Sequence, residues 1–289
     1  MNFRTEIEPL RGLENTIDHS SEIWTVGSCF ADNIGDKLLE GGFNVEVNPL
    51  GTLYNPLSIL RAVSTLVDGK RYAPADFFEH EGKWRSFDFH SIFARQTAQE
   101  SADMVNDTLD RLRARLPYLT TLMLTFGSAR GFRLNADGRV VANCHKQHPR
   151  IFTETVFTLA ECSDAILRTI ALMRGACPRL SDVILTVSPI RHKAYGLHAD
   201  RVSKATLLLA VDSICAGDPA ASYRLTISYE IMIDDLRDYR FYAPDMVHPS
   251  PVAVDYIYEK FSETYFTDAT RARAAQHFLA FRRSLHRRQ

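Results

Sequence analysis

Hydrophobic and polar residues alternate in blocks along the chain, and the blocks have two characteristic lengths. Short apolar runs, rich in β-branched and aromatic residues and followed by turn residues, predict β-strands. Longer stretches in which apolar residues recur every three or four positions predict α-helices. The predicted strands are 23–26, 43–47, 121–126, 183–187 and, as a fifth candidate, 223–228, and the predicted helices are 31–39, 56–66, 102–116, 155–173, 202–216 and 251–265.

The order of these elements predicts the fold class. Strand and helix alternate, which indicates an α/β fold with a parallel sheet of about five strands and helices on both of its faces. Two segments, 69–100 and 131–154, break the alternation, and we interpret both as insertions at the rim of the active site. No repeat or linker separates two halves, so we expect a single domain over residues 1–289.

Composition narrows the class of protein. The net charge of -1 and the pI near 6.8 give no reason to expect binding to nucleic acid or to a membrane surface. The N-terminal residues mix charges without the apolar core of a signal peptide, and no apolar run is long enough to span a bilayer. The basic stretch 271–283, with Arg287 and Arg288, is typical of a solvated last helix with a frayed tail. The five cysteines lack a CxxC pair and indicate reduced thiols in a cytoplasmic protein: Cys29, Cys144, Cys162, Cys177 and Cys215.

Ser28 follows the first predicted strand and precedes a predicted helix. In parallel sheets, ligands bind beyond the carboxyl ends of the strands. The unpaired amides that open a helix also stabilise developing negative charge, as an oxyanion hole requires. Serine is equally a common helix N-cap, so the position alone leaves a nucleophile and a cap equally open. The adjacent thiol, Cys29, is not expected to be the nucleophile, because the next residue of a helix points about 100° away.

The segment before the last of the predicted helices carries an acid and a histidine. Asp245 lies three residues before His248, and in a turn its carboxylate can reach Nδ1 of the imidazole. That contact fixes the tautomer and leaves Nε2 free to accept a proton from a nucleophile. A lone pair of this spacing is more often found on a surface without a role in catalysis. Combined with Ser28 after the first strand, it indicates a catalytic triad.

The letters from Gly27 to Ala31 spell GSCFA, and the chain resembles the GSCFA family, a branch of the SGNH/GDSL hydrolases. The resemblance covers about residues 20–265. It implies a flavodoxin-like three-layer α/β/α fold in which Ser28 is the nucleophile, His248 the base and Asp245 the acid that orients it. The other segments that carry it are Asn48 to Thr52, Trp84 to Ser91, Asn143 to Lys146, Val187 to His192, Ser203 with Lys204, and Asp245 to Pro249.

The resemblance also implies an oxyanion hole with three donors. The amide of Ser28 would be one, and Gly51, after the second strand, matches the glycine that supplies another. Alanine stands at position 129, where the pattern after the third strand has asparagine. Ser128 and Asn143 are the two candidates for the missing donor, and the sequence does not choose between them. The loss of one donor costs a factor of about 100 to 1,000 in rate.

Several polar and aromatic residues are candidates for binding substrate. On the first insertion, Trp84, Asp88 and His90 suit the faces and hydroxyls of a sugar, although Trp84 is equally suited to anchor the loop. Arg191 and His192 follow the fourth strand and are expected to bind an acidic or hydroxylated substrate. Two further residues complete the predictions: His145 is expected to line the site, and Glu230 to cap the segment after it.

We therefore expect an esterase of the serine hydrolase class that cleaves a small acyl ester, for example O-acetyl on a carbohydrate. It would need no cofactor, and its partner would be a small-molecule or glycan ester. Cys144, His145 and His148 lack a second Cys/His pair, so no metal site is expected. Two alternatives stay open: an acyltransferase that uses the same triad, and an inactive carbohydrate-binding protein with the same fold. The sequence predicts no protein partner.

Overall fold

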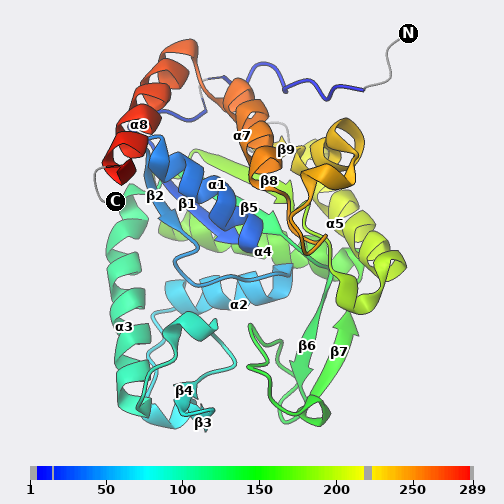
Figure 1. Ribbon diagram of the computed structural model, residues 1–289. Helices are drawn as coiled ribbons and strands as arrows, with labels where there is room; N and C mark the ends of the chain where they lie inside the picture. Colours follow the sequence, from blue (N-terminus) through cyan, green and yellow to red (C-terminus); the bar gives the residue numbers. More distant parts are fainter. Residues whose placement is uncertain (1–4, 15, 218–222, 287–289) are drawn as a thin grey trace.

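A five-stranded parallel sheet forms the centre of the molecule (Figure 1). The computed structural model describes residues 5–14, 16–217 and 223–286. The strands lie in the order β2-β1-β5-β8-β9, which is the flavodoxin-like order 2-1-3-4-5 when the five are numbered along the chain. The predicted parallel sheet is confirmed. Its strands are β1 (Glu22–Gly27), β2 (Asn44–Val47), β5 (Thr121–Phe126), β8 (Asp182–Val187) and β9 (Tyr223–Thr226).

Helices cover both faces of the sheet. On one face, α1 (Cys29–Glu40), α7 (Pro251–Tyr265) and α8 (Asp268–His286) enclose an apolar core that includes Phe30 and Ile257. On the other face lie α2 (Pro56–Val67), α3 (Ala98–Arg115), α4 (Leu159–Ala176) and α5 (Leu197–Gly217). The result is the three-layer α/β/α arrangement that the alternation predicted. Within the described residues, no helix is both long and apolar enough to cross a membrane.

The two predicted insertions contain short antiparallel hairpins. In the first, β3 (Phe78–His80) pairs with β4 (Lys83–Arg85), and in the second, β6 (Arg130–Leu134) pairs with β7 (Phe152–Val156). Both project from the lower part of the molecule in Figure 1. Short helical turns complete the chain: η1 (Pro74–Asp76), η2 (Ser91–Phe93), η3 (Leu116–Tyr118), η4 (Pro149–Ile151), η5 (Lys193–Tyr195), α6 (Ser228–Glu230), η7 (Ile231–Leu236) and η8 (Tyr239–Phe241).

Helix starts differ from the prediction where capping boxes set them. The helix expected at 155–173 begins at Leu159, because Thr158 and Glu161 form a capping box and the residues before them pair in β7. The helix expected at 102–116 begins four residues earlier, where Thr97 and Glu100 form another box. Hydrophobic periodicity finds the body of a helix, whereas the cap defines its first residue. The basic-tail residues Arg287 and Arg288 lie outside the described part of the chain.

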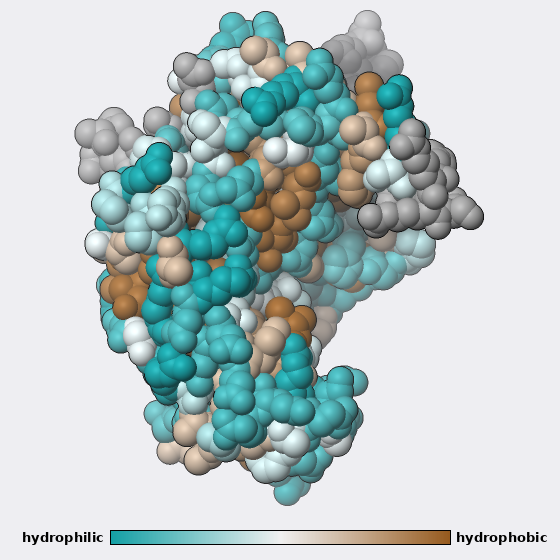
Figure 2. Space-filling view, turned by 90° about the vertical axis from the view of Figure 1, so that its left-hand side faces the viewer, coloured by the Kyte–Doolittle hydropathy of each residue, from teal (hydrophilic) through white to brown (hydrophobic). Residues whose placement is uncertain are grey.

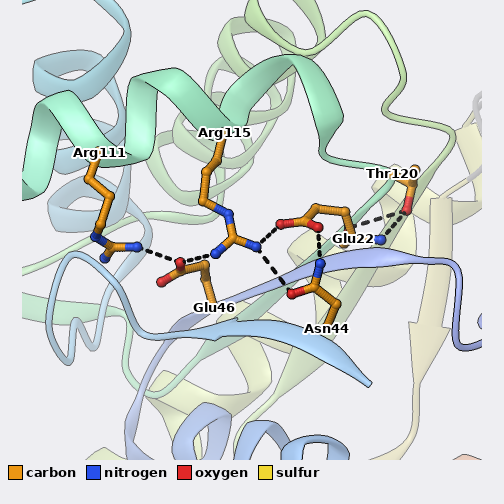
Figure 3. Close-up of polar contacts among 6 residues, drawn as sticks. All are labelled: Glu22, Asn44, Glu46, Arg111, Arg115 and Thr120. Atoms are coloured by element: carbon orange, nitrogen blue, oxygen red, sulfur yellow. Dashed lines mark hydrogen bonds and ion pairs between the residues drawn. The ribbon is translucent and has the colours of Figure 1, made fainter. Parts of the chain in front are cut away.

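Charged side chains join the end of α3 to the edge of the sheet (Figure 3). Arg115 forms ion pairs with Glu22 at the start of β1 and with Glu46 of β2, and Arg111 also pairs with Glu46. The Thr120 hydroxyl donates to the Glu22 carbonyl oxygen at 3.1 Å. Figure 2 shows this side of the molecule as mostly hydrophilic, with hydrophobic residues gathered in a central hollow. The network fixes α3, which follows the first insertion, against β1 and β2.

Asp88 is the buried anion of the first insertion. Its side chain is only 4 % exposed, and Oδ1 lies 3.0 Å from Nε of Arg61 and 3.5 Å from Arg139. Lys70 approaches Oδ2 at 3.6 Å, and the Tyr72 hydroxyl donates to the same oxygen at 3.1 Å. Burial acts to raise the pKa of Asp88, but the hydrogen bond and charge of Arg61 outweigh it, so the pKa lies below its ordinary value. The carboxylate therefore ties the insertion together as an ion.

Replacing Asp88 by asparagine is expected to destabilise the fold by roughly 2–3 kcal/mol at pH 7, because three cations lose their anion but remain partly in water. The pKa of Asp88 is lowered from 3.8 by folding, so its contribution is complete above that pH and is lost as the pH falls below it. Urea unfolding of both proteins at pH 7 and pH 3 measures the difference. A gap as large at pH 3 as at pH 7 would contradict the charge-based account.

Candidate active site

The end of β1 brings the GSCFA residues to the carboxyl edge of the sheet. Gly27 has φ +146°, and a Cβ there would lie 2.0 Å from the carbonyl oxygen of Thr125, so only glycine fits. The next amide, that of Ser28, donates to the same oxygen at 3.0 Å. Cys29 then opens α1. The close pairing of β1 with β5 therefore fixes where the helix begins.

Ser28 serves as the N-cap of α1. Its side chain is 1 % exposed, and its hydroxyl accepts the Phe30 amide at 3.4 Å. The described residues show no hydrogen bond between the Ser28 hydroxyl and His248. The predicted pairing of these two residues is therefore absent from the structure, because the cap turns the serine toward the amides of its own helix.

The side chain that meets His248 is Cys29. Its Sγ lies 3.6 Å from Nε2 of His248, and Nδ1 of the same ring lies 2.6 Å from Oδ2 of Asp245. The other carboxylate oxygen of Asp245 accepts the amides of Val247 at 2.8 Å and His248 at 3.0 Å. Asp245 thus holds the imidazole through Nδ1, as the spacing of the two residues predicted, but Nε2 faces the thiol and not Ser28. The rotation expected to carry Cys29 away from the site instead points it at the base.

The charge state of this group follows from its surroundings. The hydrogen bond from His248, with the amides of Val247 and His248, holds the pKa of Asp245 well below its ordinary value, so it stays a carboxylate. Burial, with a smaller contribution from Asp32, raises the pKa of the Cys29 thiol to about 11. The resting thiol is therefore protonated at neutral pH and must lose its proton as it reacts. Nε2 of His248 is placed to accept that proton.

Asn48 connects the end of β1 to α1. It has φ +39°, a conformation that asparagine tolerates better than most residues. Its Oδ1 accepts the Gly27 amide at 2.8 Å, and its Nδ2 donates to Asp32 at 2.6 Å. The same Nδ2 lies 3.4 Å from the carbonyl oxygen of Ser28. Asn48 thereby positions the turn that carries Cys29.

Lys204 is a buried cation beneath the site. Its side chain is 1 % exposed, and Nζ donates to the carbonyl oxygens of Gly127 at 2.6 Å and Ser188 at 2.7 Å. These two residues directly follow β5 and β8. Burial lowers the pKa of Lys204 to about 8, and its charge acts to lower the pKa of Cys29. Lys204 therefore fixes two strand ends beside the thiol.

The residues predicted for the oxyanion hole have other partners. The amide of Gly51 donates to the Asn48 carbonyl oxygen at 2.8 Å, so it closes a turn. The amide of Ser128 donates to Tyr54 at 2.9 Å, and its hydroxyl lies 3.2 Å from that of Ser203. The Gly51 amide is therefore not a free donor, whereas the hydroxyl of Ser128 stays a candidate, because either serine can donate in its contact with Ser203. The Cys29 amide, in contrast, belongs to the first residue of α1, where a helix offers the amide no acceptor of its own.

A pocket of about 230 Å³ lies between the second hairpin and the ends of the sheet. Asn143 lines it; its Oδ1 accepts the His145 amide at 2.8 Å, which leaves the Nδ2 hydrogens for a ligand. His192 also lines it and stacks on Tyr195, with ring centroids 4.1 Å apart. The pocket is further lined by Tyr54, Asn55, Ser128, Arg130, Phe132 and Cys144. Its aromatic, amide and hydroxyl groups are those that bind small polar ligands.

The predicted substrate residues on the first insertion have structural contacts. Asp88 is the buried ion described above. Trp84 packs against the larger apolar core, and its amide donates to the Arg95 carbonyl oxygen at 2.8 Å. Nε2 of the buried His145 bonds the Ser86 carbonyl oxygen at 2.9 Å. These contacts give the three residues a structural role in the insertion, and their predicted role in binding substrate stays a prediction.

His90 lies nearer the site than its neighbours in the insertion. Its Cβ packs against Gly51, where an added Cβ would lie 2.4 Å away. Burial lowers its pKa, and the charge of Asp32 opposes that shift. Its Nδ1 accepts the Ile92 amide at 3.4 Å. The charge of Asp32 thus affects the pKa of both His90 and Cys29.

Arg191 and His192 diverge although they are adjacent in sequence. His192 faces the pocket beside Asn143, whereas Arg191 lines a separate pocket behind the loop that carries His248. The predicted capping by Glu230 is not found, because η7 has no side-chain cap there. In the described part of the chain, no cluster of three or more His, Cys, Asp or Glu side chains could hold a metal.

Sequence reasoning missed Cys29, Asn48 and Lys204. One signal was available for the first of them: the letters GDSL place serine two residues after glycine, and the residue two positions after Gly27 is Cys29. Asn48 and Lys204 belong to segments on which the resemblance was drawn. Their roles depend on strand ends that meet only in the folded chain.

Two comparisons with known proteins bear on this site. A search of curated proteins found no match to the chain. The model of the GSCFA family matches residues 22–261, a span that includes all five strands of the sheet, Cys29, Asp245 and His248. The chain therefore belongs to the GSCFA family.

Proposed function

We propose that the protein is an acyl hydrolase in which Cys29 is the nucleophile, His248 the general base and Asp245 the residue that orients it. The observation that carries the proposal is the continuous contact from Sγ through the imidazole to the carboxylate, at 3.6 and 2.6 Å. Nucleophile, base and orienting acid in this order are the geometric signature of covalent acyl transfer. The reaction type is the one that the sequence predicted, with a thiol in place of the serine hydroxyl.

The proposed reaction has two steps. As Sγ attacks the ester carbonyl carbon, Nε2 of His248 takes the thiol proton, and the imidazolium then returns it to the departing alcohol. The product is a thioester on Cys29. Water, deprotonated by His248, hydrolyses the thioester and releases the acid and the free thiol. Asp245 stays ionised throughout and stabilises the imidazolium.

The start of α1 supplies the first element of oxyanion stabilisation. Cys29 is the first residue of α1, so its amide is among the donors that a helix leaves unpaired at its N-terminus and belongs to the residue that carries the reacting sulfur. In the neighbouring pocket, Asn143 carries free amide hydrogens and remains the candidate for a second donor. The polar lining of the pocket suits an acyl group on a hydroxylated carrier such as a carbohydrate.

Acyl transfer is the second candidate, with the same covalent intermediate. Asn143, Tyr195 and His192 all line the pocket and offer hydrogen-bonding groups to the hydroxyl of an acceptor. In that reaction the acceptor hydroxyl replaces water in the second step. The thiol-imidazole-carboxylate contact argues against a protein that only binds carbohydrate.

Rapid mixing with p-nitrophenyl acetate tests the proposal. We expect a burst of p-nitrophenol, an acetyl adduct in the intact mass, and a modified peptide that contains acetylated Cys29. Cys144→Ala is the matched control, since Cys144 is a second partly exposed thiol and lines the pocket. Acetylation at Ser28 would restore the serine mechanism, and a folded protein without any adduct would refute covalent catalysis on this ester.

A further inference from the structure

Behind the loop that carries His248 lies a second pocket, of about 280 Å³. Three guanidinium groups line it: Arg191 after β8, Arg201 of α5 and Arg237 after η7. They come from three separate parts of the sequence, and only the fold brings them together. None of the three proposed triad residues lines this pocket.

The three arginines are poorly neutralised. Among the described residues, no carboxylate lies within ion-pair distance of Arg191, Arg201 or Arg237. Asp234 and Asp238 also line the pocket, but Asp238 is paired with Arg240 at 3.1 Å. Arg201 bonds the Tyr229 hydroxyl with one of its N–H groups, which leaves its other donors. The balance of charge in the pocket is therefore positive.

Arg191 packs on two tyrosine rings, and one of its nitrogens has no hydrogen-bond partner among the described residues. Its guanidinium lies 3.9 Å from the centroid of the Tyr242 ring and 5.5 Å from that of Tyr239. Within the described part of the chain, its buried Nε has no hydrogen-bond partner. A buried donor without a partner is costly, although this nitrogen itself has almost no surface open to a ligand. Arginine stacked on an aromatic ring is pre-organised for oxyanions, which it binds through two N–H groups at once.

We propose that this pocket binds a small ligand that carries a phosphate or diphosphate group. A pocket of about 280 Å³ is near the lower end of the range for small-molecule sites, about 300–1,000 Å³, and exceeds the needs of a lone halide. Several guanidinium groups around one space favour a multivalent tetrahedral oxyanion over a monovalent carboxylate. The inference does not depend on the chemistry proposed for Cys29.

The site shares a wall with the proposed triad. The Arg191 amide donates to the Val247 carbonyl oxygen at 3.1 Å, directly before His248. Tyr242, beneath Arg191, forms a bridge with Pro249 on the other side of the histidine. A ligand that engages Arg191 therefore contacts the support of the loop that holds the general base.

Calorimetric titration with inorganic pyrophosphate tests the site. We expect saturable binding that weakens as ionic strength rises. Arg191→Gln and Arg237→Gln are each expected to lower the affinity about tenfold or more. Arg237 is exposed, so its replacement should not disturb folding. Arg179→Gln is the matched control: it removes an equal charge from an exposed arginine that does not line the pocket and, within the described residues, forms no ion pair with a residue that does.

The control measurements distinguish a specific anion-binding site from nonspecific attraction to surface charge. Acetate at the same ionic strength is expected not to compete with pyrophosphate. An equal loss of affinity in Arg179→Gln would overturn the proposal, since it would indicate nonspecific attraction to surface charge. The absence of binding by the wild type up to about 10 mM pyrophosphate, where even a millimolar Kd is detected, would overturn it as well.

Discussion

Cys29→Ala is expected to lower kcat/KM for p-nitrophenyl acetate by about 10³- to 10⁴-fold or more. Removal of the nucleophile from a triad leaves only the catalysis due to binding and oxyanion contacts. The replaced side chain touches His248 but contributes little to the larger apolar core, in which it is not included. Steady-state rates of the purified variant, with its melting temperature as a check on folding, measure the effect.

Ser28→Ala is the control that separates the two possible nucleophiles. Because its hydroxyl caps α1, we expect a loss of about 0.5–2 kcal/mol in the free energy of unfolding and a rate within about tenfold of the wild type. The opposite pattern, an inactive Ser28→Ala beside an active Cys29→Ala, would show that the serine reacts after a rearrangement of the turn.

Lys204→Met is expected to destabilise the protein by roughly 1–3 kcal/mol at pH 7 and to reduce kcat more than it raises KM. The loss of the donor to the carbonyl oxygens of Gly127 and Ser188 destabilises the variant. Removal of the buried charge acts in the opposite direction and limits the net effect. Folding lowers the pKa of this lysine from 10.5 to about 8. Below pH 8 the folded protein bears the full cost of the buried cation.

That cost has a defined pH dependence. Between pH 8 and 10.5 the unfolded chain binds a proton that the folded protein has released, so this group makes the wild type more stable as the pH rises. The stability gap between wild type and Lys204→Met should therefore widen over this range in urea unfolding. A gap that stays constant from pH 7 to pH 10 would mean that the lysine is not a buried cation.

The fold was predictable from local patterns of apolar residues. The elements whose bounds were predicted wrongly show which information such patterns lack. Five short apolar runs alternate with segments in which apolar residues recur every three or four positions, and this alternation is typical of a parallel sheet covered by helices. The last two residues of β7, Thr155 and Val156, were included in the predicted helix 155–173, because Val156 continues its apolar spacing and only the pairing with β6 shows that it belongs to a strand. The corrected start at Leu159 was visible in the sequence as the Thr158/Glu161 capping box.

The sequence predicted the contact between the acid and the histidine of the site, but not which side chain meets the histidine. Asp245 and His248 are three residues apart, so their contact is local and follows from spacing. The choice between Ser28 and Cys29 depends on how one turn is held by Thr125 and Asn48, which are distant in sequence. Lys204 and Asp88 are charged residues in buried positions, which no hydrophobic pattern reveals.

The ion-pair network at the end of α3 has a consequence for self-association. Strand β2 is an edge of the sheet, and an open edge offers free N–H and C=O groups to a strand of another chain. Glu46 of β2 is held by Arg111 and Arg115, so charged groups and a helix end stand where such a strand would dock. The contacts that fix α3 against β1 and β2 thereby also protect the sheet from edge-to-edge aggregation.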